Sequence, residues 1–592
     1  MQCVSKQEEE VRPTCTRCLK GKLSCYYDVE EVGTTHHTAV KRKHEAIQSE
    51  KDQLLELYGY IQSRASPEVE EIVRQIRSKS DPFSVLRFIQ EGDLLLQRQV
   101  SNPRRDARMR KIDADALQKS DIKVKAKPWT TVAGDGIVSH LLTLFFDREQ
   151  GFMMPFVDRE VFLAEMASQD IEHAEFCSPL LVNALCAFAA FTSQYAQAID
   201  ASNTIRLRGR FFNEARKLLD NERGRASIAT TQAPMILYMY STSAAMDRSG
   251  ILFRLSACEM YKRLDLGRQV STRNRDYDVS VYQTLFAKNA WGLFGLERYP
   301  ECPGHVTSSI PVPKLPRYFL PSHERTNDPL KTTNIFDAQC EVASIFYRIT
   351  TYVLSRTAHD IGSKEDITRR EALYGALKRW ESTVPALNRY PPDSRHYYYY
   401  LRAWYHFAAI VIWRPLVDIN TVLPSIPFTN VVFLTVSHCS DLLSDFEECK
   451  AVHPVDFERG SISTLNFHFH TAFTLVTMLK KHSIAHELFT SICRFFYTGS
   501  SYWPAATAIL GGLLAVSRQM GTKLPREAES LCSGASVQAQ PGAMDVPVGW
   551  AIPNHAEFVE MLENGDDTAD ADRASIELGT LIQKWTSMSV SS

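Results

Sequence analysis

The chain has 592 residues, of which 44% are hydrophobic and 23% charged, ordinary proportions for a soluble globular protein. This length is too great for one compact core, so it predicts several domains or one large helical body with appendages. Lys and Arg total 67 and Asp and Glu total 69, a formal net charge of −2, which excludes a strong overall attraction to nucleic acid or membranes. Any such attraction must be local.

The cysteines and the apolar runs exclude two further classes. The 13 cysteines are odd in number, and the N-terminus lacks the apolar segment of a signal peptide, which argues against a secreted disulfide scaffold. The longest apolar stretches, at 180–191 and 505–516, fall short of the roughly 20 residues that cross a bilayer. The sequence therefore predicts a protein of a reducing compartment with no membrane partner.

Residues 12–28 read RPTCTRCLKGKLSCYYD and are the most informative stretch of the chain. Cys15, Cys18 and Cys25 have C-x2-C-x6-C spacing, in which two thiolates from a tight turn bind one metal and the third closes the site. Tetrahedral zinc needs four ligands, and Cys3 is the other cysteine nearby. In a reducing compartment this spacing favours Zn2+ over a disulfide. The alternative is three unpaired cysteines in an unstructured tail.

This stretch resembles the second half of the fungal Zn2Cys6 binuclear cluster, in which two C-x2-C-x6-C half-sites share two zinc ions. Cys15, Cys18 and Cys25 match the family's fourth, fifth and sixth cysteines, and Cys3 matches the third. The resemblance implies that these four residues bind zinc, and that residues 1–33 form a partial DNA-binding module. Basic side chains in and beside the loop are predicted to contact DNA phosphates: Arg17, Lys20 and Lys22.

The family's first two cysteines, and the basic helix that reads bases in the major groove, have no counterpart in this sequence. Because the first cysteine bridges both zinc ions in the family, the complete cluster cannot form in the chain as written. Either the chain starts at an internal methionine of a longer protein, or the protein has lost direct DNA binding. The first explanation is favoured, because an unused half-site would decay, and it predicts weak or absent DNA binding by this truncated chain.

A linker and a short coiled coil are predicted at 34–63. Four apolar residues recur every seven positions, as in the dimerisation seam of a two-stranded coil: Val40, Ile47, Leu54 and Ile61. Lys43 and Glu50 occupy the other core positions, so a single amphipathic helix folded onto the body is an equal alternative. The order of cluster, linker and coil in the resembling family favours a homodimer.

Residues 64–129 are predicted to form a basic helical connector. The sequence S-P at 66–67 opens one helix, and S-D-P at 80–82 separates it from the next. The basic runs at 103–111 and 123–127 are interpreted as solvated surface, with nuclear import as the alternative.

From residue 130 onward, apolar residues recur at spacings of three and four, which predicts an all-α body. This part divides into a regulatory domain at 130–450 and C-terminal helices with an acidic tail at 451–592. Four helices are prominent, the first apolar on all sides and therefore buried and the second amphipathic: 179–196, 208–223, 227–247 and 250–268. The last is predicted to end at Gly267, and a polar link is predicted at 532–547.

The order of these segments resembles the fungal-specific transcription factor domain, or middle homology region. Residues 286–299 resemble its W-x-x-F-x-x-D-R segment, with Trp291, Phe294 and Arg298 in place and Glu297 instead of Asp. Trp291 and Phe294 share a helix face and are predicted to be core residues, with a role in a ligand pocket as the alternative. The resemblance implies a domain that regulates activity through internal contacts or a small-molecule effector.

The sequence carries none of the common enzyme motifs. The sequence has no P-loop, no dinucleotide fingerprint and no G-x-S-x-G nucleophile elbow. HELFT at 486–490 has Thr490 where a zinc protease needs its second histidine. His468 and His470 point in different directions on a helix, so we expect core or surface residues, not metal ligands. The sequence predicts that the protein is not an enzyme.

These observations predict an all-α, nuclear, zinc-dependent transcriptional regulator of RNA polymerase II genes. With a complete cluster it would bind CGG-type half-sites as a dimer, a preference implied by the resemblance, and act on the transcription machinery. Two alternatives stay open: a regulatory or scaffolding protein without direct DNA binding, and an all-α ligand-binding protein or enzyme.

Overall fold

The computed structural model describes residues 20–22, 51, 54, 73–74, 76–77, 103–148, 154–200, 206–264, 279–297, 310–315, 332–356, 360–392, 395–417, 423, 430–452 and 462–538. The chain divides into two compact units, Met1–Arg108 and Met109–Ser592. In the first unit the described residues are helical or lie in a turn. The second unit contains the hydrophobic core.

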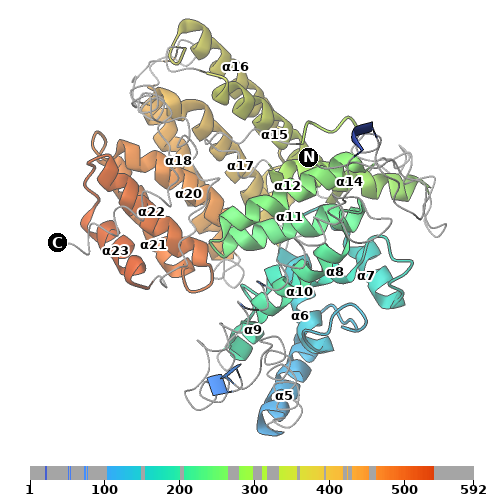
Figure 1. Ribbon diagram of the computed structural model, residues 1–592. Coiled ribbons are helices and arrows are strands. Elements are labelled where there is room, and N and C mark those ends of the chain that lie inside the picture. The colour runs from blue at the N-terminus through green and yellow to red at the C-terminus, as the bar shows by residue number, and fades with distance from the viewer. Residues whose placement is uncertain are drawn as a thin grey trace. The chain divides into compact units, whose positions relative to one another are not determined.

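Helices joined by turns make up the fold of the described residues, which contain no β-sheet (Figure 1). The predicted all-α class is therefore confirmed. The helices are α5 (Pro103–Lys119), α6 (Asp135–Arg148), α7 (Arg159–Ser168), α8 (Pro179–Ala189), α9 (Gln194–Asp200), α10 (Leu207–Asn221), α11 (Ile228–Ser243), α12 (Asp247–Arg263), α14 (Val279–Glu297), α15 (Thr332–Leu354), α16 (Lys364–Glu381), α17 (Arg395–Trp413), α18 (Val431–Val452), α20 (Ile462–Met478), α21 (Ile484–Gly499), α22 (Pro504–Gln519) and α23 (Arg526–Gln538). Short 3-10 turns, η2 (Leu387–Arg389) and η4 (Arg414–Leu416), lie before and after α17.

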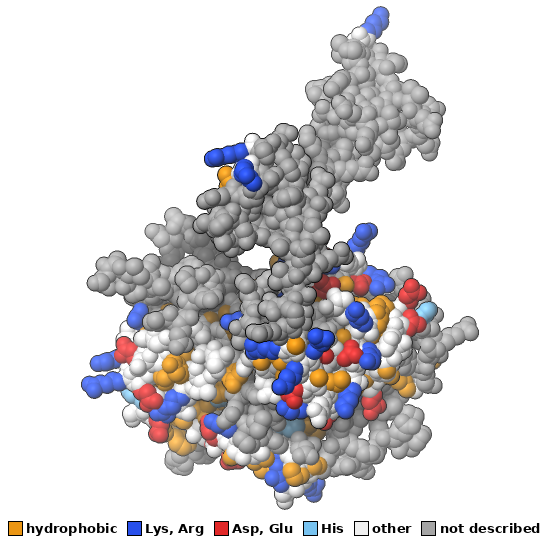
Figure 2. Space-filling view, turned by 90° about the horizontal axis from the view of Figure 1, so that it is seen from below, with side chains coloured by type: hydrophobic (Ala, Val, Ile, Leu, Met, Phe, Trp, Pro, Cys, Tyr) orange, Lys and Arg blue, Asp and Glu red, His pale blue; other side chains and the backbone are white. Residues whose placement is uncertain are grey.

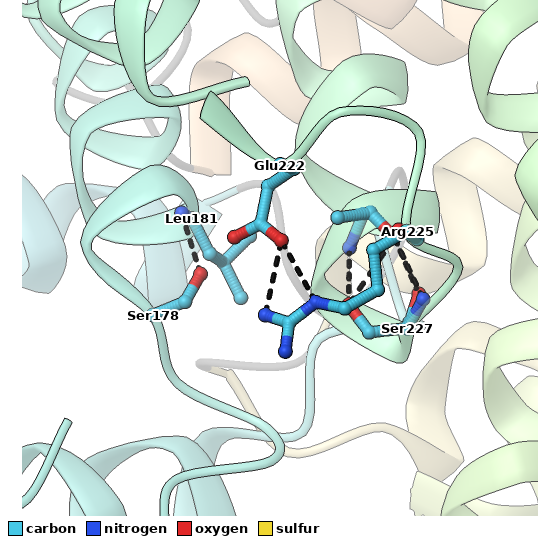
Figure 3. Close-up of polar contacts among 6 residues, drawn as sticks. Ser178, Leu181, Glu222, Arg225 and Ser227 are labelled. Carbon is cyan, nitrogen blue, oxygen red and sulfur yellow. Dashed lines mark hydrogen bonds and ion pairs between the residues drawn. The ribbon is translucent and has the colours of Figure 1, made fainter. Parts of the chain in front are cut away.

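Serine caps set where two of the central helices begin (Figure 3). Ser178 accepts a hydrogen bond at 3.1 Å from the backbone N–H of Leu181, in the first turn of α8. Ser227 accepts one at 3.2 Å from the N–H of Thr230, whose hydroxyl accepts from the Ser227 N–H, and this capping box opens α11. Such caps satisfy backbone donors that have no partner within the helix, and each stabilises it by about 1 kcal/mol.

The helices α8 and α11 form the centre of the N-terminal part of the core. Leu180–Ala189 is buried throughout, and so is every residue of α11. α8 packs against α6, α10 and α11, while α11 packs beside α12 (Figure 1). The outer helix α10 buries Phe211, Phe212 and Ala215 and exposes polar residues on its other side, which confirms its predicted amphipathic pattern.

The helix α17 has the corresponding central position among the C-terminal helices. It packs against α15, α16, α18 and α20, and most of its residues from Tyr399 to Trp413 are buried. α11 contacts α22, and Phe191 stacks on Trp503 with ring centroids 5.0 Å apart. The N-terminal and C-terminal helices of the second unit therefore share one continuous hydrophobic core.

The buried helix predicted at 179–196 is in fact two helices. α8 ends at Ala189 and α9 begins at Gln194, because the hydroxyl of Ser193 accepts the N–H of Ala196 at 3.2 Å and starts a new helix. The predicted burial is confirmed. The apolar residues continue through 179–196, so the sequence pattern does not indicate that Ser193 divides this segment into two helices.

The predicted end of the helix at 250–268 is also wrong. α12 ends at Arg263 and does not continue to Gly267, since Leu264 already has an extended backbone. Leu264 packs against a small buried group that includes Phe176 and Tyr282. Burial of this leucine side chain therefore competes with continuation of the helix, and a glycine signal further along does not decide where the helix ends.

The polar link predicted at 532–547 is helical as far as Gln538, within α23. Cys532 is fully buried, and its Sγ lies 4.0 Å from that of Cys493 in α21. α23 packs against both α21 and α22. Small residues that resemble a linker in sequence therefore allow this last described helix to approach its neighbours closely.

The described surface carries both signs of charge. Figure 2 shows Lys and Arg side chains interspersed with Asp, Glu and hydrophobic side chains on the face that it presents. This mixture agrees with the net charge of −2 for the whole sequence. Within the ranges described above, no helix combines the length and hydropathy needed to cross a bilayer.

Candidate functional site

Most of the predicted N-terminal site lies outside the described residues. This applies to the proposed zinc ligands, to one phosphate contact and to three dimerisation residues: Cys3, Cys15, Cys18, Cys25, Arg17, Val40, Ile47 and Ile61. Lys20 is helical, Lys22 lies in a turn, and both are exposed. Leu54 is helical and 47% exposed. The zinc site, the phosphate contacts and the dimer seam therefore stay predictions.

The aromatic pair predicted in the core is found there. Trp291 and Phe294 lie on α14, are 7% and 0% exposed, and pack edge to face with ring centroids 5.8 Å apart. The indole N–H of Trp291 donates to the carbonyl of Leu315 at 3.1 Å. A cavity of about 30 Å³ adjoins Trp291, Phe336 and Trp404, which is room for about one water molecule. Trp291 thus contributes to packing, and Arg298 of the same motif lies outside the described residues.

Glu297, which replaces the family's usual Asp, joins three segments at the end of α14. Its fully buried carboxylate accepts the N–H of Ile310 at 2.8 Å and the thiol of Cys258 at 3.1 Å, and it lies 4.0 Å from Arg254. Burial, together with the charge and the hydrogen bond of Glu297, raises the pKa of Cys258, so this thiol stays protonated and acts as a donor. Glu297 therefore holds α12, α14 and the segment at 310–315 together.

The histidines of α20, predicted to be core or surface residues, lie in the core. His468 and His470 are 4% and 3% exposed. His468 stacks on Phe495 with ring centroids 3.8 Å apart, and its Nδ1 donates to the carbonyl of Thr464 at 2.7 Å. Burial lowers the pKa of His468 to about 4 and lowers that of His470 as well, so both rings are neutral at pH 7. The side chain of Thr490 bonds to the backbone of its own helix, to the carbonyl of His486.

A polar cluster that sequence analysis missed lies between α16, α17 and α18. Its residues, named here the imidazole cluster, are Tyr374, Arg402, Tyr405, His406, His438, Asp441 and Asp445. The two histidines are 3% and 5% exposed. The sequence signals are R-x3-H in α17 and H-x2-D-x3-D in α18, which place side chains on one helix face. These spacings are common in ordinary helices, so they do not indicate a site.

Hydrogen bonds run in series through the imidazole cluster. Arg402 Nη2 lies 3.0 Å from His406 Nε2, and because a guanidinium only donates, this nitrogen accepts. His406 Nδ1 then donates to His438 Nδ1 at 2.9 Å. His438 Nε2 in turn donates to the Tyr374 hydroxyl at 3.0 Å. This series leaves each imidazole neutral, with one N–H and one acceptor nitrogen.

Burial and nearby charges keep His438 neutral. Burial, together with the neighbouring His406 and Arg402, lowers the pKa of His438 to about 3. The charge of Arg402 is balanced by Asp445, whose two oxygens lie 2.9 and 3.0 Å from its Nε, and by Glu381 at 3.6 Å. The cluster thus brings two imidazoles close to carboxylates, and both kinds of group can bind zinc in proteins.

Comparison with known proteins supports the resemblance to fungal transcription factors. Residues 142–299, from α6 to the end of α14, match the family model described as the fungal specific transcription factor domain. The chain is 25% identical over 406 residues to the notoamide biosynthesis transcriptional activator notL' of Aspergillus versicolor. This alignment spans 63% of the chain and 64% of that relative, just under two thirds of the relative's length.

Proposed function

We propose that this protein is a nuclear, zinc-dependent transcriptional regulator that binds DNA in a sequence-specific manner. The proposal rests on the order of two features along the chain. A C-x2-C-x6-C half-site at Cys15, Cys18 and Cys25 precedes a helical segment, 142–299, that matches the fungal specific transcription factor domain. The aligned relative is named as a transcriptional activator, which supports the same reading.

The physical basis of DNA binding is the N-terminal module. Zinc bound by Cys3, Cys15, Cys18 and Cys25 would fold a short segment that has too few apolar residues to form a core of its own. The basic residues of its loop would contact phosphates, which position the module on the duplex without reading its sequence. A complete cluster would add the base-reading helix, and a coil at 34–63 would set the spacing of two CGG-type half-sites.

The helical body is proposed to regulate this module and to contact the transcription machinery of RNA polymerase II genes. The protein is proposed not to be an enzyme, since its sequence carries no catalytic motif and its buried histidines bond within the core. The proposal includes a small-molecule effector. Such an effector would not bind beside Trp291, because the cavity there has room for only about one water molecule.

Genomic occupancy and metal content of the full chain test the proposal together. We expect the protein with its complete cluster to occupy promoters. Changing Cys15, Cys18 and Cys25 to Ser should abolish this occupancy and lower the zinc content of this chain by up to one ion. The matched control is Cys449→Ser, a buried cysteine of α18 far along the sequence from the half-site. Occupancy that persists without the three cysteines would favour a scaffolding protein recruited by partners, and a zinc content equal to that of the unsubstituted chain would refute the predicted ligands.

A further inference from the structure

Three potential metal ligands converge in the imidazole cluster. His406, His438 and Asp441 each offer one ligand atom, and these atoms lie within 4.8 Å of one another. The two imidazoles are buried, and the carboxylate is exposed. A cation can therefore reach the rings from solvent past Asp441. Two nitrogens, one carboxylate oxygen and one solvent molecule make a tetrahedral zinc site.

The distance between the two rings is close to what zinc requires. Zn–N bonds of about 2.0–2.1 Å at a tetrahedral angle place two nitrogens roughly 3.3 Å apart. The Nδ1 atoms of His406 and His438 are 2.9 Å apart, with one proton between them. Replacing this proton by a metal ion requires the rings to separate by about 0.4 Å and to tilt until both nitrogen lone pairs point at the ion.

Asp441 completes the ligand set by a side-chain rotation. It follows His438 by three residues on α18, so both side chains project from the same helix face. Its carboxylate is exposed and accepts a hydrogen bond from Ser437 at 3.4 Å, which is long for a hydroxyl donor. Because this bond is weak, little free energy opposes rotation of the carboxylate toward the imidazoles.

The remaining polar groups of the cluster orient the two rings. His438 keeps its Nε2 proton on the Tyr374 hydroxyl, which leaves Nδ1 free to coordinate. When His406 coordinates through Nδ1, its proton moves to Nε2. The hydrogen bond from Arg402 to Nε2 then breaks, and Asp445, 3.4 Å from that nitrogen, becomes the acceptor of its proton. A carboxylate behind a coordinating histidine is a common arrangement in zinc sites. The charge of Arg402 beside it is balanced by Asp445 and Glu381.

We propose that His406, His438 and Asp441 form a binding site for a divalent cation of the zinc type between α17 and α18. The cation would link two helices of the C-terminal core and would be independent of the N-terminal cysteines. This site goes beyond the proposed function, because it places metal binding in the helical body.

Cobalt(II) is the probe, because it enters zinc sites and its visible absorption reports a tetrahedral geometry. The protein tested is the full chain with Cys3, Cys15, Cys18 and Cys25 changed to Ser, which removes the predicted N-terminal ligands. We expect one equivalent of Co2+, without the near-ultraviolet absorption of cobalt–thiolate bonds, displaced by one equivalent of Zn2+. Metal should also raise the melting temperature of this protein.

Single substitutions in that background assign the ligands. His438→Gln should abolish binding, and Asp441→Asn should weaken it by about tenfold or more. Glu447→Gln, which alters another exposed carboxylate of α18, is the matched control and should leave the affinity unchanged. Because Asp441 is exposed, its substitution should leave folding intact even where His438→Gln does not, and circular dichroism checks this.

Two results would overturn the inference. One is the absence of bound Co2+ or Zn2+ in the cysteine-substituted chain at millimolar metal. The other is an unchanged affinity in Asp441→Asn and His438→Gln. Neither result would affect the transcriptional proposal, because zinc at the N-terminal cysteines and promoter occupancy are measured separately.

Discussion

Replacement of Asp366 by Asn tests the contribution of a buried ion pair to the C-terminal core. Arg370 Nε donates to the Asp366 carboxylate at 2.8 Å, and the two side chains are 0% and 1% exposed. The same carboxylate accepts from the Tyr352 hydroxyl at 2.9 Å and from the Gly362 N–H at 3.0 Å, while Arg370 also donates to the carbonyl of Ile412. One ion pair therefore connects α15, α16 and α17.

The expected loss follows from the charge that remains. Asn has the shape of Asp and keeps an acceptor oxygen, but it leaves the guanidinium of Arg370 buried without a counter-charge. Removing one partner of a buried ion pair costs about 3–5 kcal/mol. With an unfolding entropy of about 2.1 cal/mol/K per residue over roughly 430 residues of the helical body, the melting temperature should fall by about 3–6 °C.

Differential scanning calorimetry of the full chain measures this shift. Glu365→Gln is the matched control, because Glu365 is exposed and lies in the same first turn of α16. Both substitutions remove a negative charge from the helix N-terminus, an effect of about 0.3–1 kcal/mol, so the control should shift the melting temperature by about 1 °C or less. Adding Arg370→Met to Asp366→Asn should restore part of the loss, since no buried charge then remains. Equal shifts for Asp366→Asn and Glu365→Gln would refute the argument.

Three further predictions concern α20 and α14. Since the folded pKa of His468 is about 4, the unfolded chain binds the extra proton below about pH 6.5. This histidine alone should make stability fall with acidification by about 1.4 kcal/mol per pH unit down to pH 4, and His468→Phe should reduce the total slope in melting temperatures measured across that range by that amount. Gly292→Ala would place a Cβ 2.9 Å from the Cβ of Phe156 and should destabilise the protein by about 1–3 kcal/mol. Gly295→Ala would place a Cβ with nothing within 4 Å and should stabilise the protein by about 0.5–1 kcal/mol. Equal changes in melting temperature, measured by calorimetry, would contradict the described packing. Glu297→Asp shortens the side chain by one methylene and should cost about 1–3 kcal/mol, so an unchanged melting temperature would show that the bond to Ile310 contributes little.

The fold class and the core could be predicted because hydrophobic periodicity reports local burial. The spacing of three assigns Trp291 and Phe294 to the core, whereas the spacing of His468 and His470 argues only against a shared metal and leaves both core and surface positions open. Helix ends were predicted less well, since they depend on single side chains and on distant partners. Ser193 divides an apolar run with one hydroxyl, and Leu264 leaves its helix to pack against residues from other elements.

The imidazole cluster could not be found from sequence for a related reason. His406 and His438 are 32 residues apart and meet only because α17 packs beside α18. Neither helix alone carries a recognised ligand spacing, so their convergence depends on the crossing of the two helices. The N-terminal cysteines are the opposite case, because all three ligands of the half-site lie within eleven consecutive residues, Cys15 to Cys25, and local spacing alone indicates zinc.

The shared core has a consequence for how this protein can be dissected. The family match ends at residue 299, yet Phe294 packs on Tyr347 of α15, and Trp503 of the C-terminal part stacks on Phe191. A fragment cut at that limit would leave large aromatic surfaces facing water and would be prone to aggregate. The segment that matches the family model is thus shorter than the segment that shares the core, and a transplanted helical body should extend to Gln538.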